Sequence, residues 1–393
     1  MNEVVIVAGA RTAVGSFGKS LRNVKATELG RQVLEGLMEN SGLGKEKVNE
    51  VIFGHGYVHG GGLNSARISS QLACFPHSVP GHVVIKACGS GLKAITNAAL
   101  TIAAGQEDVI IAGGVESMSN VPYIVKNRWG GKFGNLTMED ALLADGLICS
   151  LENDHMGITA ERLAEKYGIR REEQDQFAYQ SHKKAWKAIE EGRFNREIIS
   201  LKIKDRKGLQ IFNHDEGVRE DIHLDQLASL QAVFKNEGTI TAGNACPMND
   251  GAAAVLLMSK QQAEEKGLKP LLKIKAFASA GVEPGVMGIG PVPATRKALE
   301  KAGLSLGDIG LIELNEAFAA QALAVIKELD LNPDIVNVNG GAIALGHPVG
   351  ATGAKLTVTL MHEMLRSQVK YGMVTLCMAG GMGLSVIYEN MCN

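Results

Sequence analysis

The stretch His82-Val-Val-Ile-Lys-Ala-Cys-Gly-Ser-Gly-Leu-Lys-Ala94 decides the fold that this chain is expected to adopt. Residues 82–85 predict a short strand, the glycines on either side of Ser90 predict a tight turn, and residues 92–104 predict a helix. A strand that passes through a glycine-rich turn into a helix is typical of α/β proteins. The stretch therefore places Cys88 between the end of a strand and the start of a helix.

The order of strands and helices around this stretch occurs a second time in the chain. In the first occurrence, the sequence predicts strands at 3–8, 48–54, 82–85 and 108–114 and helices at 26–40, 64–73 and 92–104. In the second occurrence, it predicts strands at 271–277, 311–314, 335–338 and 373–378 and helices at 295–302, 316–329 and 353–365. CGSGLKA (88–94) and VIIAGGV (109–115) align with VGATGAK (349–355) and TLCMAGGMG (375–383). A duplicated unit is the favoured interpretation, and two merely similar α/β halves are the alternative.

The residues between the two occurrences of this order have a different composition. Charged helix patterns at 159–167 and 172–191 replace the apolar strands, and a strand at 252–258 returns to the first half. The first half is therefore expected to be discontinuous. The expected organisation is an N-terminal half formed by residues 1–118 and 240–268, an inserted loop domain at 119–239, and a C-terminal half at 269–393.

Composition excludes several classes of protein. The chain has 393 residues, of which 45% are hydrophobic and 21% charged, so it can bury a large core. No apolar run approaches the ~18 residues of a membrane span. A count of 40 Lys and Arg against 42 Asp and Glu leaves no basic excess for binding nucleic acid or a membrane surface. Six cysteines without a CxxC spacing exclude a disulfide scaffold and a zinc ribbon, so a cytoplasmic protein with free thiols is expected.

Cys88 is the first candidate for chemistry. Its place beside a helix N-terminus favours the thiolate over the thiol, and the unpaired N–H groups of the turn can bind an oxyanion. The turn resembles the nucleophile elbow of hydrolases. The alternative is a small buried cysteine in a tight turn.

A histidine occupies the corresponding turn of the second half, within GHPVGATG (346–353). His347 could activate a thiol or donate to a developing oxyanion, whereas a lone histidine on a loop is often structural. If the halves are related by a pseudo-twofold axis, Cys88 and His347 face one central crevice.

Two further residues stand at predicted strand ends. Asn315 follows the strand at 311–314, and either caps the next helix or holds a water that faces a substrate carbonyl. Cys377 ends the strand at 373–378, where a partly ionised thiol could act as a general base. Ligands of α/β sheets bind beyond the C-terminal ends of the strands. Two cysteines, a histidine and an asparagine at such ends therefore predict one active site.

These motifs resemble those of the thiolases. The resemblance runs from Val4 to the end of the chain and rests on CGSGLKA, NEAFAAQ, GGAIALGHPVGATGA and CMAGGMG, with TAGNACPMNDGAA and HMGITAE between them. It implies duplicated βαβαβαββ halves that form a five-layered α-β-α-β-α core with an inserted loop domain. The segment RWG (128–130) with His155 and Met156 is similar to tetrameric, short-chain members, which implies a homotetramer built as a dimer of dimers.

The similarity is closest to the biosynthetic members and implies acetyl-CoA C-acetyltransferase activity, the condensation of two acetyl-CoA to acetoacetyl-CoA and CoA and the reverse thiolysis. By resemblance, Cys88 would take the acetyl group with the help of His347, and Cys377 would remove the α-proton of a second acetyl-CoA. One oxyanion site would be His347 with a water held by Asn315. The other would be the backbone N–H groups of Cys88 and Ala379. This chemistry, part of lipid metabolism, uses CoA and acyl-CoA as substrates and needs neither a metal nor another cofactor.

The resemblance also implies which residues contact CoA. They are Leu147, His155, Met156, Arg219, Phe234, Ala242, Cys246, Met287 and Phe318. Without it, the Met and Phe residues among them would be taken as ordinary core residues. This chain departs from the family where NACP (244–247) replaces the usual Asn-Ala-Ser-Gly and where Ala379 replaces the first of three glycines. These departures bear on acyl-chain preference and CoA affinity.

Three other functions remain open at this point. A broader-chain 3-ketoacyl-CoA thiolase of fatty-acid degradation would show activity that rises with acyl length. A ketoacyl synthase is disfavoured by Cys377 and by Asn315, which stands where that group has histidine. A catalytically weak thiolase-like redox sensor or scaffold would use a disulfide between Cys88 and Cys377.

Overall fold

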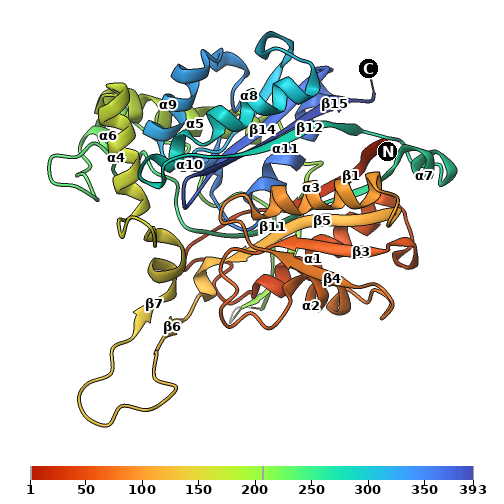
Figure 1. The fold of residues 1–393 in the computed structure, drawn as a ribbon, viewed down its shortest axis with the longest axis horizontal. Helices are drawn as coiled ribbons and strands as arrows, with labels where there is room; N and C mark the ends of the chain where they lie inside the picture. Colours follow the sequence, from red (N-terminus) through yellow and green to blue (C-terminus); the bar gives the residue numbers. More distant parts are fainter. Residues whose placement is uncertain (1, 206–207, 393) are drawn as a thin grey trace.

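Two similar halves of the chain share one mixed sheet in the computed structural model, which describes residues 2–205 and 208–392 (Figure 1). The first half contains β1 (Val4–Thr12), β2 (Gly15–Ser16), α1 (Ala26–Ser41), η1 (Lys45–Lys47), β3 (Glu50–Gly54), α2 (Ser65–Leu72), β4 (Gly81–Val84), α3 (Ser90–Ala103), β5 (Val109–Ser117), β11 (Asn249–Ser259) and α7 (Lys260–Glu265). The second half contains β12 (Leu272–Gly281), η4 (Pro284–Ile289), α8 (Pro291–Ala302), η5 (Leu306–Asp308), β13 (Leu311–Leu314), α9 (Ala319–Leu329), η6 (Pro333–Ile335), α10 (Ala342–Leu345), α11 (Thr352–Ser367), β14 (Tyr371–Met378) and β15 (Met382–Asn390).

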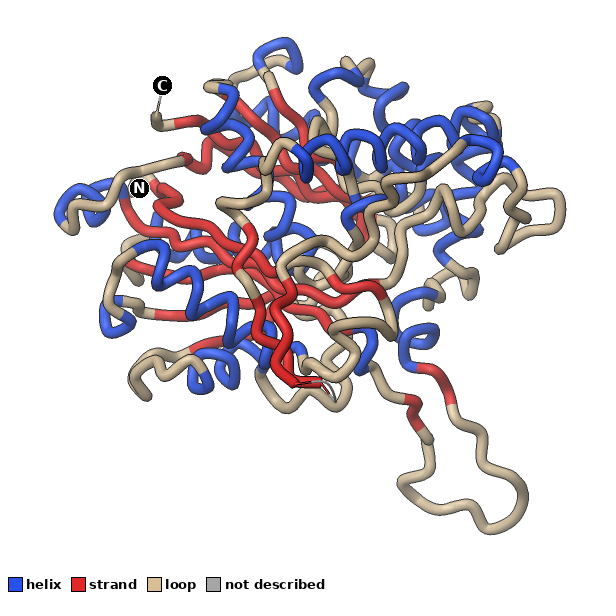
Figure 2. The backbone as a smooth tube through the Cα atoms, turned by 180° about the vertical axis from the view of Figure 1, so that it is seen from behind, coloured by secondary structure: helices blue, strands red, loops and turns tan. Residues whose placement is uncertain are grey.

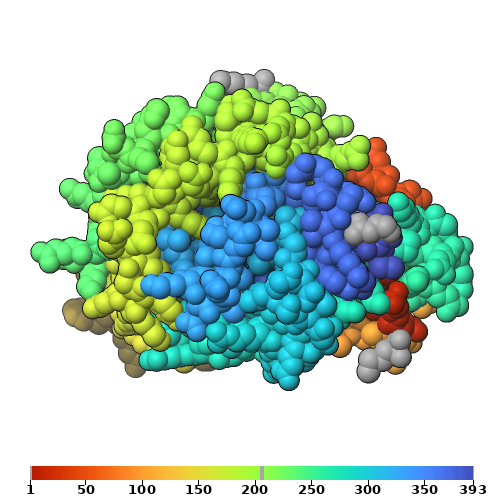
Figure 3. Space-filling view, turned by 90° about the horizontal axis from the view of Figure 1, so that it is seen from above, coloured from red at the N-terminus to blue at the C-terminus, as the bar shows by residue number. Residues whose placement is uncertain are grey.

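An intervening segment, residues 118–248, separates β5 from β11. It contains η2 (Met118–Asn120), β6 (Tyr123–Ile124), β7 (Glu139–Asp140), η3 (Leu143–Leu147), α4 (Met156–Tyr167), α5 (Arg171–Glu190), β8 (Ile198–Ile199), β9 (Leu201–Asp205), β10 (Gly208–Phe212) and α6 (Leu224–Ala228). Figure 3 shows this segment, in yellow and green, lying along the blue second half. No helix in the described ranges is both long and apolar enough to span a bilayer.

The strand order repeats in the two halves. It is β1–β11–β5–β3–β4 in the first half and β12–β15–β14–β13 in the second. In both, the strands nearest the junction pair antiparallel and the outer strands pair parallel. The halves meet where β1 and β12 pair antiparallel, through Val5 with Lys273 and Ile6 with Leu272. The predicted duplication of the α/β unit is therefore confirmed.

Helices form three layers around the two halves of the sheet. One apolar cluster packs α1 and α2 onto the outer face of the first half, and another packs α8 and α9 onto the outer face of the second. A third cluster joins α3 and α11 to both inner faces. Both central helices are buried over most of their length, and α11 carries several buried polar side chains among its apolar ones. The order of layers is α-β-α-β-α, as predicted.

Glycines let the two central helices begin side by side. A Cβ on Gly350, just before α11, would lie 2.6 Å from the backbone nitrogen of Gly56 and 2.6 Å from the carbonyl oxygen of Val115. A Cβ on Gly91, in the first turn of α3, would lie 2.8 Å from the carbonyl oxygen of Gly350. Only glycine allows backbones to approach so closely. The Cys88 and His347 turns therefore converge.

One predicted strand is absent, and several predicted boundaries are shifted, among them the start of α8, which lies at Pro291 and not at residue 295. Residues 335–338 form no strand: η6 occupies Pro333–Ile335, and Val336 makes only an isolated bridge to Ile312. Pro333 has no N–H for a ladder, and the Asn332 side chain accepts from the backbone of Asp334, which favours a helical turn. The helix expected from residue 316 begins at Ala319, because Phe318 is extended (φ −146°, ψ 146°).

A narrow arm projects from the body of the protein. It runs between β6 and β7, and Figures 1 and 2 show it from opposite sides, well clear of the layered core. Trp129 and Phe133 on this arm are almost fully exposed, at 94% and 103%.

Candidate active site

A small, mostly apolar chamber of about 120 Å³ lies where α3 and α11 begin. Both halves and the intervening segment contribute to its walls. The lining residues are Gly56, Tyr57, Ala87, Cys88, Asp145, Gly146, Leu147, Met156, Cys246, Met287, Ala317, Phe318, His347, Val349 and Ala379. The chamber therefore lies beyond the C-terminal ends of strands from both halves, as expected for an α/β sheet.

Local hydrogen bonds hold Cys88 at the chamber wall. The Ser90 hydroxyl donates to the carbonyl oxygen of Ala87 (2.7 Å) and accepts from the backbone N–H of Lys86 (2.7 Å). Ala87 has a positive φ of 47°, which is strained for a residue with a side chain. Backbone strain of this kind is common beside functional side chains. The Cys88 side chain is consequently aimed into the chamber and stays partly exposed.

Cys88 is a thiol at neutral pH. Burial against apolar walls raises the pKa of Cys88 to about 11, although the nearby backbone N–H groups of Ala379 and of Cys88 itself oppose that shift. The negative charge of Glu116 raises the pKa further. The expectation of a resting thiolate is therefore wrong, because desolvation outweighs the helix N-terminus. Cys88 needs a base, and the two N–H groups expected to form an oxyanion site lie near its sulfur.

His347 is suited to be that base. Its Nδ1 lies 2.6 Å from the Thr352 hydroxyl oxygen, and that hydroxyl donates its only hydrogen to the carbonyl oxygen of Pro348 (2.9 Å). Thr352 must therefore accept from Nδ1–H, which leaves the lone pair on Nε2. Burial, aided by the cationic Lys355, lowers the pKa of His347 to about 3. His347 is thus a neutral imidazole at rest, and its own hydrogen bond to Thr352 leaves the lone pair of Nε2 available to accept a proton.

Two side chains that the sequence reasoning missed hold the histidine loop. The amide of Asn249 accepts from the backbone N–H of His347 (2.8 Å) and donates to the carbonyl oxygen of Gly15 (3.0 Å). Buried Lys355 donates to the carbonyl oxygen of Gly346 (2.8 Å). Both residues lie within motifs quoted above, but nothing in the sequence alone shows which backbone atoms they reach.

Glu116 is a third such residue. Its carboxylate is fully buried and accepts from the backbone N–H groups of Gly56 (2.9 Å), Tyr57 (3.2 Å) and Gly350 (2.8 Å). It joins the end of β3 to the histidine loop, and thereby the first half to the second. Its signal in the sequence is a lone carboxylate at the end of the apolar run 109–115.

Cys377 lies close to Cys88. A Cβ on Gly89 would be 2.2 Å from the sulfur of Met378, so the Cys88 turn packs directly on the end of β14. Burial raises the pKa of Cys377 well above its usual range, with further contributions from Cys88 and Cys246. Cys377 is therefore a buried, protonated thiol at rest.

Asn315 is fully buried at the end of β13. Its backbone N–H donates to the carbonyl oxygen of Thr375 (3.1 Å), but within the described ranges neither polar atom of its side chain has a partner. It is not a helix cap, because α9 begins only at Ala319, after Phe318. An unpaired buried amide costs stability, and such groups are often retained for function.

The residues expected to contact CoA fall into three groups. Leu147, Met156, Cys246, Met287 and Phe318 line the Cys88 chamber. His155 stacks on Phe234 (ring centroids 4.5 Å apart), and Phe234 meets Phe318 edge-on at 6.1 Å, so this pair extends the chamber wall outward. Exposed Arg219 and Ala242 line a neighbouring cavity of about 190 Å³ and are not brought into the chamber.

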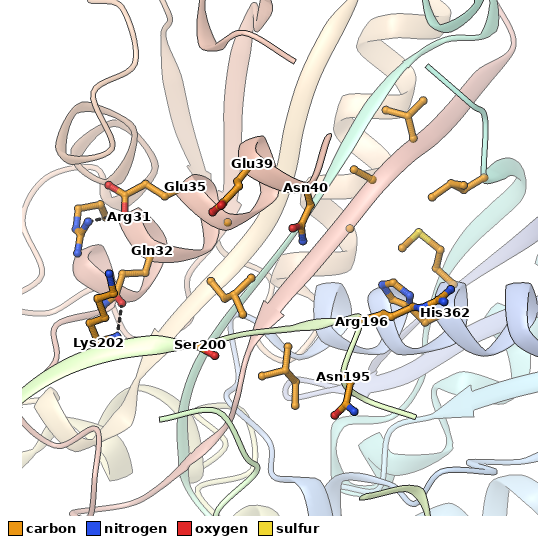
Figure 4. Close-up of a pocket in the computed structure, with 18 residues that line it drawn as sticks. Arg31, Gln32, Glu35, Glu39, Asn40, Asn195, Arg196, Ser200, Lys202 and His362 are labelled. Atoms are coloured by element: carbon orange, nitrogen blue, oxygen red, sulfur yellow. Dashed lines mark hydrogen bonds and ion pairs between the residues drawn. The ribbon is translucent and has the colours of Figure 1, made fainter. Parts of the chain in front are cut away.

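A larger cavity, of about 870 Å³, lies between α1, α11 and residues 195–202 (Figure 4). Its polar walls include Arg31, Glu35, Arg196 and His362. No cysteine is among the residues that line it in the part of the chain described. The nucleophile candidates therefore belong to the smaller chamber.

Comparison with known proteins agrees with this geometry. The family models "Thiolase, N-terminal domain" and "Thiolase, C-terminal domain" match residues 4–261 and 268–390. The chain belongs to the thiolase family and is an acyltransferase.

Relatives of known name match over almost the whole chain. It is 51% identical to acetyl-CoA acetyltransferases of Chromobacterium violaceum and Pseudomonas aeruginosa, over 98% of this chain and 99% of each relative. The crystal structure of the Bacillus anthracis acetyl-CoA acetyltransferase is similar with a TM-score of 0.98 and 45% identity, covering 100% of this chain and 99% of that one. The crystal structure of human mitochondrial 3-ketoacyl-CoA thiolase is similar with a TM-score of 0.97 and 40% sequence identity, covering 99% of this chain and 99% of that one.

Proposed function

We propose that this thiolase is an acetyl-CoA C-acetyltransferase, which condenses two acetyl-CoA to acetoacetyl-CoA and CoA and catalyses the reverse thiolysis. The observation that carries the proposal is a small apolar chamber lined by both the Cys88 thiol and the neutral His347. The protonated Cys377 lies close to Cys88. Relatives at 51% identity bear that name, which supports the choice within the family.

The first half-reaction transfers an acetyl group to Cys88. His347 Nε2 takes the thiol proton, and the sulfur attacks the acetyl-CoA carbonyl. When the tetrahedral intermediate collapses, Cys377 gives its proton to the leaving CoA sulfur. Acetyl-Cys88, a protonated His347 and a Cys377 thiolate remain. A thiol with a raised pKa is a suitable donor only because a thiolate is released next to it.

The second half-reaction forms the carbon–carbon bond. The Cys377 thiolate takes the α-proton of a second acetyl-CoA, and the resulting enolate attacks the acetyl carbonyl on Cys88. Cys88 leaves as a thiolate and takes back the proton held by His347. The proton count is then restored, and both cysteines are thiols again.

Two sites would stabilise the negative oxygens. The N–H groups of Cys88 and Ala379, which lie near the Cys88 sulfur, suit the oxyanion of the acetyl group carried on Cys88. His347 and a water held by the unpaired amide of Asn315 suit the thioester oxygen of the CoA substrate. The proposed reaction uses CoA and its thioesters as substrates and requires no further cofactor.

CoA would approach along the intervening segment. The five predicted contacts that line the chamber would hold the reactive end, and the stacked pair His155 and Phe234 would flank the pantetheine. Arg219 and Ala242, further out, would face the nucleotide. The division into residues 1–118 with 240–268, 119–239 and 269–393 stays a proposal. The two family matches, 4–261 and 268–390, support only its division between the two halves near residue 268.

The exposed arm supports assembly as a homotetramer, a dimer of dimers. Large apolar side chains exposed on a projecting element are typical of an interaction site. A cytoplasmic location in lipid metabolism is part of the same proposal, supported by six cysteines that are all free.

The test is thiolysis of 3-ketoacyl-CoA substrates with CoA, followed by loss of the enolate absorbance. The wild-type protein is expected to cleave acetoacetyl-CoA best, and Cys88→Ala is expected to lower kcat by at least about a thousandfold. Activity that rises steadily with chain length would favour a broad 3-ketoacyl-CoA thiolase. No turnover with any chain length would favour a scaffold or redox sensor.

A further inference from the structure

Tyr57 closes one side of the Cys88 chamber. Its ring lines the chamber, and only 5% of the residue is exposed. A Cβ on Gly146 would lie 2.0 Å from the Tyr57 hydroxyl oxygen, so the end of the ring rests directly on the backbone of η3. The hydroxyl faces the carbonyl oxygen of Leu142 at 3.4 Å.

The chamber lies between two apolar clusters. One contains Met156, Met287, Phe318 and Cys377 with Phe234 packed against it, and it leads toward the side from which CoA is proposed to enter. The other contains Tyr57, Met118 and Leu142, and Leu147, Met248 and Val349 pack against it. Tyr57, Met118 and Leu142 in this second cluster are all buried, and Met118 and Leu142 lie at the base of the β6–β7 arm.

Tyr57 cannot easily move aside. The Glu116 carboxylate fixes its backbone N–H (3.2 Å) and, through Gly350, the loop that carries His347. Burial raises the pKa of the Tyr57 phenol, and a negative charge on the nearby Cys88 sulfur would raise it further, so the Tyr57 side chain is neutral. A rigid, well-packed wall excludes longer substrates more sharply than a mobile one does.

We propose that Tyr57 sets the acyl-chain limit of this enzyme by walling off the space beyond the acyl group that Cys88 carries. The inference rests on the proposed thiolase reaction and specifies its substrate class: 3-ketoacyl-CoA thioesters whose transferred acyl group is an acetyl group or little larger. Tyr57 and Cys88 line the same chamber, of about 120 Å³, so the Tyr57 ring bounds the space into which an acyl group on Cys88 can extend.

The experiment compares kcat/KM for thiolysis of acetoacetyl-CoA with that of 3-ketohexanoyl-CoA, whose cleavage leaves a butyryl group on Cys88. In Tyr57→Ala the ratio of the longer to the shorter substrate is expected to rise about tenfold or more, since one methylene in an apolar pocket is worth about 10- to 200-fold. Tyr57→Leu keeps an apolar side chain in the cluster of Tyr57, Met118 and Leu142 and should shift the ratio in the same direction. This variant replaces Tyr57→Ala in the experiment if the alanine variant fails to fold. Tyr57→Phe keeps the ring, and its ratio should stay within about twofold of wild type.

The outcomes separate this inference from the proposed function. A wild-type protein without acetoacetyl-CoA thiolysis would count against the proposed function. An active wild type with an unchanged ratio in folded Tyr57→Ala or Tyr57→Leu would overturn the role of Tyr57. A ratio that rises as much in Tyr57→Phe as in the smaller variants would also overturn it, because the hydroxyl and not the ring would then set the limit.

Discussion

At the scale of single residues, the site is governed by desolvation. Cys88 and Cys377 are kept as thiols and His347 as neutral imidazole because burial disfavours their charged forms. A neutral thiol beside a neutral base needs no buried ion pair before substrate binds. Charge develops only during the reaction, next to N–H groups that are already in place.

The reactivity of Cys88 with pH tests this arrangement. Because the pKa of Cys88 is raised to about 11, its thiolate fraction should keep increasing as the pH rises from about 7 to about 10. The rate of iodoacetamide alkylation, followed on the Cys88 peptide by mass spectrometry, should increase over the same interval. A plateau at about pH 8 would show that the thiolate is stabilised instead.

Asn315 should show a trade between stability and activity. Its buried amide has no partner in the described chain, so Asn315→Leu removes an unsatisfied polar group and should leave the Tm unchanged or raise it. The same change should lower kcat for thiolysis by about 100- to 1,000-fold, the usual cost of a lost oxyanion donor. A large drop in Tm with activity retained would show that Asn315 is structural.

At the scale of elements, the turns before α3 and α11 are joined by buried polar side chains. Asn249 and Lys355 hold the backbone on either side of the His347 loop, and Glu116 links that loop to the end of β3. The catalytic geometry therefore depends on residues that need not touch the substrate.

Glu116 offers the clearest test at this scale. Glu116→Ala leaves three buried N–H groups without an acceptor, each costing about 1–3 kcal/mol, so the free energy of unfolding in urea should fall by about 3 kcal/mol or more. Glu116→Gln keeps one carbonyl acceptor and should lose less. Wild-type stability in Glu116→Ala would show that the contacts are unimportant.

The sequence predicted elements better than contacts. The strand at 311–314 was placed to the residue, and the turns at Cys88 and His347 were identified from glycine and strand patterns. The strand expected at 335–338 is absent because Pro333 and Asn332 favour a local turn. For Asn315 the sequence left two roles open, a helix cap or a group that holds a water, because the cap is excluded only by the position at which α9 begins. Glu116 was missed because its partners are backbone atoms of distant segments. Tyr57 was not predicted as a site residue, because a single tyrosine outside any motif does not indicate a functional role.

At the scale of the whole molecule, two copies of one α/β unit face each other across a shared pair of central helices (Figure 1). The duplication brings the ends of strands from both halves to one place, so the site is assembled only when the halves are joined. The intervening segment supplies the remaining walls from residues 145–156 and Cys246.

The arm should control assembly without altering the chamber. The double variant Trp129→Ser, Phe133→Ser removes two almost fully exposed apolar side chains. Light scattering is expected to give the mass of a tetramer for the wild type and of a dimer for the variant. Circular dichroism should be unchanged, since neither residue packs in the core. A wild-type mass in the variant would contradict the assignment of the arm to the tetramer contact.

The central claim is that Cys88, with His347 as its base, carries the acyl group. The most direct measurement is mass spectrometry of the protein after brief exposure to acetyl-CoA, with the modified peptide sequenced. The account predicts one acetyl group on Cys88, formed much more slowly in His347→Ala and absent in Cys88→Ala. An acetyl group on Cys246 or Cys377, or turnover with none on Cys88, would contradict it.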